Sequence, residues 1–160
     1  VVTLKEARPL LADQLTHVVA NAANANIATA LRETRDDLIG NHGGVPPKNG
    51  ALDKLNSNDP VSAITKLQSA ISFLAQAESA GAGDLTALKD MLGLVAEGIA
   101  TDTYLAAKAR FPNPSPGQAK TLATIAALLV QGHQQLVAHQ YAAACDSFKL
   151  AANKASVMLK

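Results

Sequence analysis

The chain has 160 residues and a formal net charge of +1, and 48% of its residues are hydrophobic although only 3% are aromatic. A chain of this length can bury a core, which must be built here from Ala, Leu, Ile and Val. Its Lys and Arg residues are scattered among acids, which excludes the basic stripe of a nucleic-acid-binding protein. The longest apolar run, Leu122 to Val130, is far shorter than the roughly 20 residues of a membrane-spanning helix, so no membrane span is expected.

Apolar residues recur at helical spacing along most of the chain, and no long stretch alternates as a strand does. We therefore expect an all-α fold, a helical bundle of about five to seven helices. The first helix is expected to begin near Pro9 and to break around Asn24 and Asn26, where the apolar stripe slips in phase. Residues 42–50 combine several glycines with Pro46 and Pro47, which predicts the longest loop.

Later helix boundaries carry cap signals. The expected starts, each an N-cap followed by the first helical residue, are Asp59-Pro60, Asp84-Leu85 and Ser115-Pro116. Gly81 and Gly83 are expected to close the helix that opens at the first of these starts. The last helix is expected to begin at Tyr141.

An internal repeat is the most informative pattern. Leu55 and Leu136 are 81 residues apart, and each is followed by a helix opener and then by Ala and apolar residues at matching positions. The matched positions are Leu55, Pro60, Ala63, Ile64, Leu67 and Ala70 in one copy and Leu136, Tyr141, Ala144, Cys145, Phe148 and Ala151 in the other. The offset predicts two related halves, 1–80 and 81–160, forming either separate units or one continuous core.

Residues 27–100 also resemble a known family. They contain Leu55-Asn56-Ser57-Asn58-Asp59, then Ala63-Ile64-x-x-Leu67, then Gly83-Asp84-Leu85 leading to Leu92 and Ile99. This pattern resembles the FIMAH-type helical module of secreted bacterial proteins. It departs from the module at Asn58, where glycine is usual, and at Ile71, where an aromatic residue is expected. The resemblance implies an appended, non-catalytic role, and it brings no catalytic residues to carry over.

Residues with reactive side chains form no recognisable site. His133 and His139 are six residues apart, about 240° of rotation on a helix, so we predict no metal site. Cys145 matches Ile64 on an apolar face, which favours a buried thiol over a nucleophile. Asp36 and Asp37 are neighbours among arginines, which indicates a solvated face with local ion pairs. We predict no catalytic residue and no cofactor.

The one binding segment that the sequence suggests is Val45-Pro46-Pro47, in the expected long loop. It is interpreted either as a contact for a partner or as a plain rigid loop.

The predicted function is a non-catalytic accessory or interaction module of an extracytoplasmic or secreted bacterial protein. Its partner is then another protein or the rest of a larger polypeptide. Low charge, with many Ala, Asn, Gln, Ser and Thr, favours that location, and a chain that begins at Val1 suggests a processed or excised protein. The alternative is a self-associating structural subunit of an extracellular assembly. A third hypothesis, an enzyme or cofactor-binding bundle, is disfavoured because no polar residues converge at helical spacing.

Overall fold

The computed structural model describes residues 29, 32–34, 36–37 and 50–160. In chain order its helices are α3 (Ala51–Asn56), α4 (Pro60–Ser79), α5 (Thr86–Arg110), α6 (Pro116–Val137) and α7 (Tyr141–Leu159). Residues 32–34 and 36–37 are also helical, and the described residues include no strand. The predicted all-α fold is therefore confirmed. The expected helix from Pro9 with its break, and all but Gly50 of the expected loop, lie outside the described residues.

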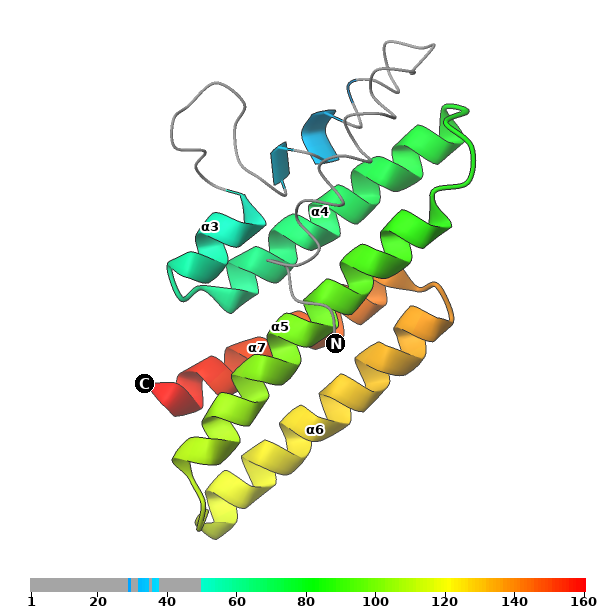
Figure 1. The fold of residues 1–160 in the computed structure, drawn as a ribbon. Helices are drawn as coiled ribbons and strands as arrows, with labels where there is room; N and C mark the ends of the chain where they lie inside the picture. The colour runs from blue at the N-terminus through cyan, green and yellow to red at the C-terminus, as the bar shows by residue number, and fades with distance from the viewer. Residues whose placement is uncertain (1–28, 30–31, 35, 38–49) are drawn as a thin grey trace.

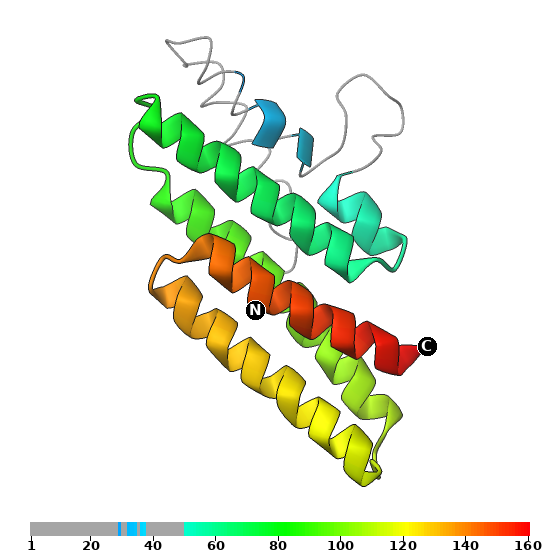
Figure 2. The same cartoon turned by 180° about the vertical axis from the view of Figure 1, so that it is seen from behind.

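Helices α4 to α7 run alternately up and down, each antiparallel to the next (Figure 1). α5 and α7 pack against each other, and each also packs against both α4 and α6. α4 and α6 lie on opposite sides of this central pair in both views (Figures 1 and 2). The bundle therefore leaves one face of α5 and one face of α6 side by side at its surface.

One hydrophobic core joins the described helices, from Ala51 in α3 to Ala155 in α7. Small and aliphatic side chains fill it, as the composition predicts, and Phe148 is its largest fully buried residue. The buried face of α5 includes Leu88, Leu92 and Val95, whose alternating spacing of four and three residues marks the side of a helix that faces a core. The predicted halves thus contribute to a single core in the part of the chain described.

Two of the three predicted helix starts are confirmed. The Asp59 carboxylate accepts a hydrogen bond from the backbone N–H of Ser62 at 3.0 Å, and Pro60 is the first residue of α4. Ser115 forms a reciprocal capping box with Gln118 at the start of α6.

The third predicted start is wrong by one residue. Leu85 occupies the N-cap position of α5, and it supplies no side-chain hydrogen bond. Asp84 instead accepts from the N–H of Thr86 at 2.9 Å, which lowers the pKa of its carboxyl. A carboxylate at the N-cap, or one residue before it, can accept a hydrogen bond from one of the free N–H groups at the helix N-terminus. The sequence signal is therefore the same whether the helix begins at residue 85 or at residue 86.

The turns before α4 and α7 have the same backbone geometry at an interval of 81 residues. Asn58 and His139 both adopt left-handed conformations, with φ of 59° and 57°. In each turn this residue's N–H donates three residues back and the next N–H donates five residues back, at 2.8 to 3.0 Å. The duplication itself stays a prediction, because most of the first half lies outside the described residues.

Two glycines allow close packing around α6. A Cβ on Gly132 would overlap the ring of Phe148, and one on Gly93 would overlap the end of the Leu136 side chain. The two sites differ in how easily the neighbour can move. The Phe148 ring is rigid and fully buried, whereas a leucine methyl group can rotate away.

We therefore expect Gly132→Ala to lower the free energy of unfolding by about 1 to 3 kcal/mol. This loss should persist although alanine favours helix over glycine by about 1 kcal/mol. Gly93→Ala is the matched control and should cost much less. Urea unfolding of both variants measures the difference, and equal losses would contradict this account of the packing.

Candidate functional site

The exposed large hydrophobic side chains of the described residues are concentrated on one surface. Of six such residues, four lie on α5 or α6 and are between 42% and 67% exposed, namely Leu94, Leu105, Val130 and Val137. The other two, Leu150 and Val157, lie on α7. Single exposed apolar residues are ordinary, but a contiguous group indicates a contact surface.

The spacing of these residues places them on a shared face. Residues seven apart in a helix lie within about 20° of each other around its axis. Leu94 therefore shares a face with Thr101, and Val130 shares one with Val137. The α5 side of this face holds Leu94, Glu97, Thr101 and Leu105. The α6 side holds Ala126, Val130, His133 and Val137. We call these eight residues the α5/α6 strip.

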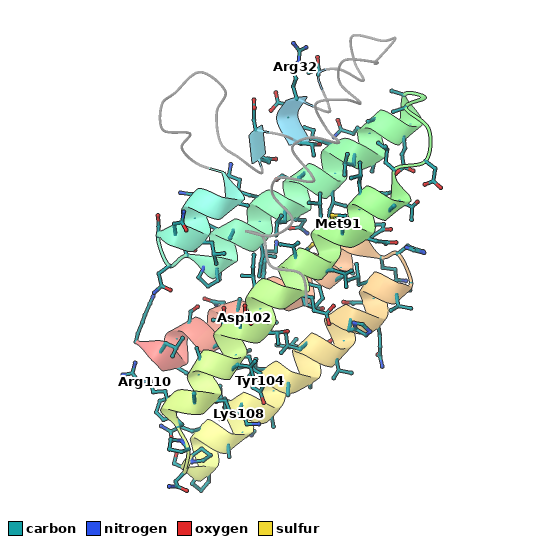
Figure 3. All side chains as sticks on the ribbon, in the orientation of Figure 1. Arg32, Met91, Asp102, Tyr104, Lys108 and Arg110 are labelled. Atoms are coloured by element: carbon teal, nitrogen blue, oxygen red, sulfur yellow. The ribbon has the colours of Figure 1, made fainter. Side chains whose placement is uncertain are left out.

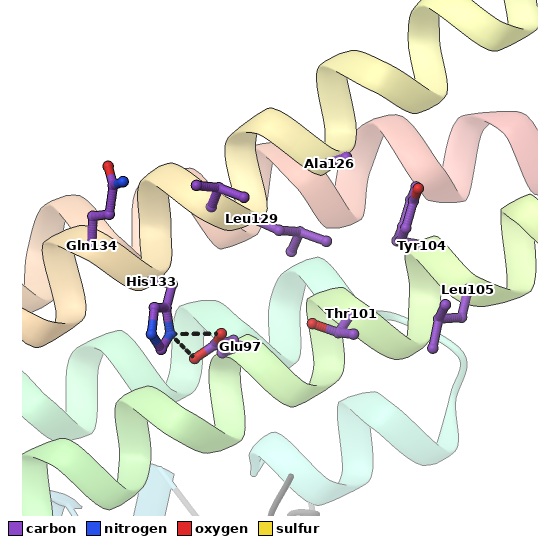
Figure 4. Close-up of a pocket in the computed structure, with 9 residues that line it drawn as sticks. Glu97, Thr101, Tyr104, Leu105, Ala126, Leu129, His133 and Gln134 are labelled. Carbon is purple, nitrogen blue, oxygen red and sulfur yellow. Dashed lines mark hydrogen bonds and ion pairs between the residues drawn. The ribbon is translucent and has the colours of Figure 1, made fainter.

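A shallow groove of about 540 Å³ runs along the middle of the strip (Figure 4). Side chains from both helices line it, including Thr101 and Leu105 on one wall and Ala126 and Val130 on the other. Beyond Leu105, α5 continues through Lys108 toward the loop that joins it to α6 (Figure 3). Most of the groove's lining is apolar, and its acid–base pair lies at the end away from that loop.

That polar pair is Glu97 and His133, which face each other across the two helices (Figure 4). His133 Nδ1 lies 3.0 Å and 3.2 Å from the two carboxylate oxygens of Glu97. Both groups remain open to solvent, with 54% of the His133 side chain and 25% of the Glu97 side chain exposed. The pair places one acid beside one base within a largely apolar surface.

The groove also holds the hydroxyl groups of Thr101 and Tyr104. In the described part of the chain, no hydrogen bond links either hydroxyl to His133 or Glu97; the Thr101 and Tyr104 side chains are not tied into the pair. A His–Glu pair could move a proton, but nucleophilic catalysis also needs a nucleophile within hydrogen-bond reach of the base. In the described residues, these hydroxyl groups are therefore not hydrogen-bonded to the His133–Glu97 pair as a nucleophile would be.

A second polar cluster lies where the turn before α7 meets α5. The Tyr141 hydroxyl donates to Asp90 at 2.7 Å, and His139 Nδ1 lies 3.2 Å from the same carboxylate oxygen. Lys89 pairs with Glu78 and lies 5.2 Å from the centre of the Tyr141 ring. Burial, and then the hydrogen bond to Asp90, raise the pKa of the Tyr141 hydroxyl. These contacts tie the turn to α4 and α5, so we assign the cluster a structural role.

The histidines that the sequence singled out are separated in the structure. His133 pairs with Glu97 near the C-terminal end of α6, whereas His139 lies past the end of that helix beside Asp90. The residues that the structure describes contain no group of three or more His, Cys, Asp or Glu side chains placed to hold a metal ion. Val45, Pro46 and Pro47, the suggested binding segment, lie outside the described residues.

Cys145 is fully buried in the core, as its place in the repeat predicts. Burial raises the pKa of its thiol to about 12, and nearby Lys149 only partly offsets that effect. A thiol in this state is a poor nucleophile at neutral pH.

The interpretation of Asp37 as part of a solvated face is wrong. Its side chain is only 16% exposed, and its carboxylate lies 3.5 Å from Lys66 Nζ on α4. Burial raises the pKa of Asp37, and the Lys66 charge partly offsets that effect. The long-range partner explains why local sequence could not show this burial.

The α5/α6 strip was not among the sequence predictions, although the sequence contains a signal for it. The buried stripe of α5 includes Leu88, Leu92 and Val95, and Leu94 and Leu105 lie off that stripe with a separation of eleven residues. Val130 and Val137 likewise lie off the buried stripe of α6. A second apolar face on each of two consecutive helices is the pattern that could have revealed the surface.

Among the helices described, none is both long enough and apolar enough to cross a membrane. Comparison of the chain with protein-family models, with curated proteins and with solved structures found no match.

Proposed function

We propose that the protein is a non-catalytic accessory or interaction module of an extracytoplasmic bacterial protein, and that the α5/α6 strip is its contact surface. The partner is another protein or the rest of a larger polypeptide. The low charge of the chain, with many Ala, Asn, Gln, Ser and Thr residues, supports the extracytoplasmic location. The resemblance to FIMAH-type modules supports the appended role.

The observation that carries this proposal is the grouping of four exposed Leu and Val side chains on one face. Burying such a side chain completely is worth about 1.5 to 3 kcal/mol. Because each of the four is already about half buried, a partner could gain about 1 kcal/mol from each, or about 4 kcal/mol together. That gain would offset part of the cost of association, and it is absent while the strip faces water.

Photo-crosslinking tests the proposal directly. A benzophenone amino acid at position 130 should form adducts with a partner in the native host, whereas the same probe at position 157 should not. Val157 is a matched control because it is 62% exposed, against 58% for Val130, but lies on α7. Adducts should appear in an extracytoplasmic fraction.

The captured partner should then bind the purified chain. Val130→Glu should weaken that binding at least tenfold, because a charge would be buried in an apolar contact, and Val157→Glu should leave it unchanged. Equal adducts from both positions, or none from either, would refute the strip as the contact surface.

The second candidate function is a self-associating structural subunit of an extracellular assembly. It requires a surface that can pair with its own copy. The strip contains one acid and one base side by side, Glu97 and His133, so a second copy could place its base opposite this acid and its acid opposite this base.

A further inference from the structure

We infer that the α5/α6 strip binds a second copy of this chain, with a two-fold axis parallel to α5 and α6. In this arrangement α5 of each copy lies over α6 of the other. The inference rests on the proposed function, because it takes the strip to be the contact surface and names its partner.

The strip consists of rows that run from α5 to α6. Glu97 and His133 form one row, since they are in contact. Because the helices are antiparallel, the residue one turn before Glu97 is level with the residue one turn after His133, so Leu94 and Val137 form a second row. Thr101 with Val130 and Leu105 with Ala126 form the remaining rows in the same way. Together the rows cover about 16 Å of helix length, at 1.5 Å per residue.

A two-fold axis parallel to the helices places the α5 side of each row where the α6 side of the other copy lies. It leaves the position of the row along the helices unchanged. Each α5 residue then faces the α6 residue of the same row in the second copy. Leu94 of one copy faces Val137 of the other, and Glu97 faces His133. Such an isologous contact repeats each pair twice.

Charge complementarity selects this axis from the other face-to-face arrangements. Placing Glu97 opposite its own equivalent would bring two carboxylates together, and sliding the copies by one row would bury a charge against leucine or valine. Only the row-for-row exchange places the Glu97 carboxylate opposite the His133 ring, whose N–H can donate to it, and each apolar group opposite an apolar or small one. The Glu97–His133 contact within each chain is retained.

Helix direction supports the same arrangement. α5 and α6 are antiparallel, so α5 of the second copy runs antiparallel to the α6 that it covers. The two copies would thus form a four-helix bundle in which every neighbouring pair is antiparallel, a common packing for helices joined by short loops.

The size of the strip sets the expected strength. Eight residues from each copy are fewer than the roughly 20 per side of a standard stable interface. The dimer should therefore be weak and should appear only as the protein concentration rises.

Sedimentation equilibrium of the purified chain tests this inference. The apparent mass should rise from the monomer value of 16.5 kDa toward twice that value as the concentration increases to about 1 mM. Val130→Glu should raise the dissociation constant at least tenfold, and the control Val157→Glu should leave it unchanged. Both side chains are more than half exposed, so neither change disturbs the core.

Charge reversal tests the pairing itself. Glu97→Lys and His133→Glu should each weaken self-association at least tenfold, because the first places an ammonium group opposite His133 and the second places two carboxylates opposite each other. Mixing the two variants should restore association at least tenfold, because the lysine introduced at position 97 then faces the glutamate introduced at position 133. A mixture that associates no better than either variant alone would overturn the two-fold arrangement.

A wild-type chain that stays monomeric at about 1 mM would overturn the inference, as would equal weakening by Val130→Glu and Val157→Glu. Neither result would remove the proposed function if the probe at position 130 still captured a different protein. A monomeric chain together with no adduct from position 130 would overturn both.

Discussion

Replacing Phe148 with alanine is expected to lower the free energy of unfolding by about 3 to 5 kcal/mol. Phe148 is the largest of the fully buried side chains, and its ring packs directly against Gly132 of α6. Alanine would leave a cavity between α6 and α7, which the surrounding rigid helices can close only partly. Urea unfolding followed by circular dichroism measures the loss.

Leu150→Ala is the matched control for this prediction. It removes a large apolar side chain two residues further along α7, at a position that is 46% exposed. Its cost should stay below about 1 kcal/mol, because little apolar surface leaves the core. Similar losses for both variants would mean that Phe148 does not occupy the core as described.

The thiol of Cys145 is expected to react with a thiol reagent about a thousandfold more slowly in the folded protein than in urea at pH 8. The pKa of the buried thiol is raised from 9.0 to about 12, which lowers the thiolate fraction by about three orders of magnitude. Burial also blocks access of the reagent. Comparable rates in the folded and unfolded protein would show that the helix around Cys145 opens readily.

The same shift makes stability depend on pH in the alkaline range. The unfolded chain loses the Cys145 proton near pH 9, whereas the folded chain holds it to about pH 12. The contribution of the buried thiol to stability is therefore fully present below pH 9 and is lost as the pH rises toward 12. The free energy of unfolding falls by at most about 1.4 kcal/mol per pH unit, so the loss amounts to about 2 to 3 kcal/mol by pH 11.

Cys145→Ala isolates this effect. The stability advantage of the wild type over the variant should shrink by about 2 to 3 kcal/mol between pH 8 and pH 11. The raised pKa of Tyr141 acts in the same direction, but it is present in both proteins and cancels in the difference. A difference that stays constant over this range would contradict the buried state of the thiol.

Local signals explain which parts of the fold the sequence could predict. Asp59-Pro60 and Ser115-Pro116 were identified because a cap acts within one turn of its helix. Cys145 was correctly placed in the core because the repeat matched it to Ile64. The start of α5 was predicted one residue too early, because the Asp84 carboxylate can bind the N–H groups at the helix N-terminus from the N-cap or from the residue before it.

Long-range contacts explain what the sequence could not predict. The burial of Asp37 depends on α4, through a pair with Lys66 far along the chain. The roles of Gly93 and Gly132 depend on which side chains the neighbouring helices bring against them. The spacing of apolar residues along one helix does not show which side chains of other helices will meet it.

Local sequence was enough to predict that the described part of the chain is helical and where most of its helices begin. These properties follow from hydrogen bonds and apolar spacing within a few residues. The tertiary structure decided that the outer faces of α5 and α6 lie side by side, because that depends on how the whole bundle closes around α7. Leu94 and Val137 are unremarkable as separate residues, and only the packing of the two helices makes them parts of one surface.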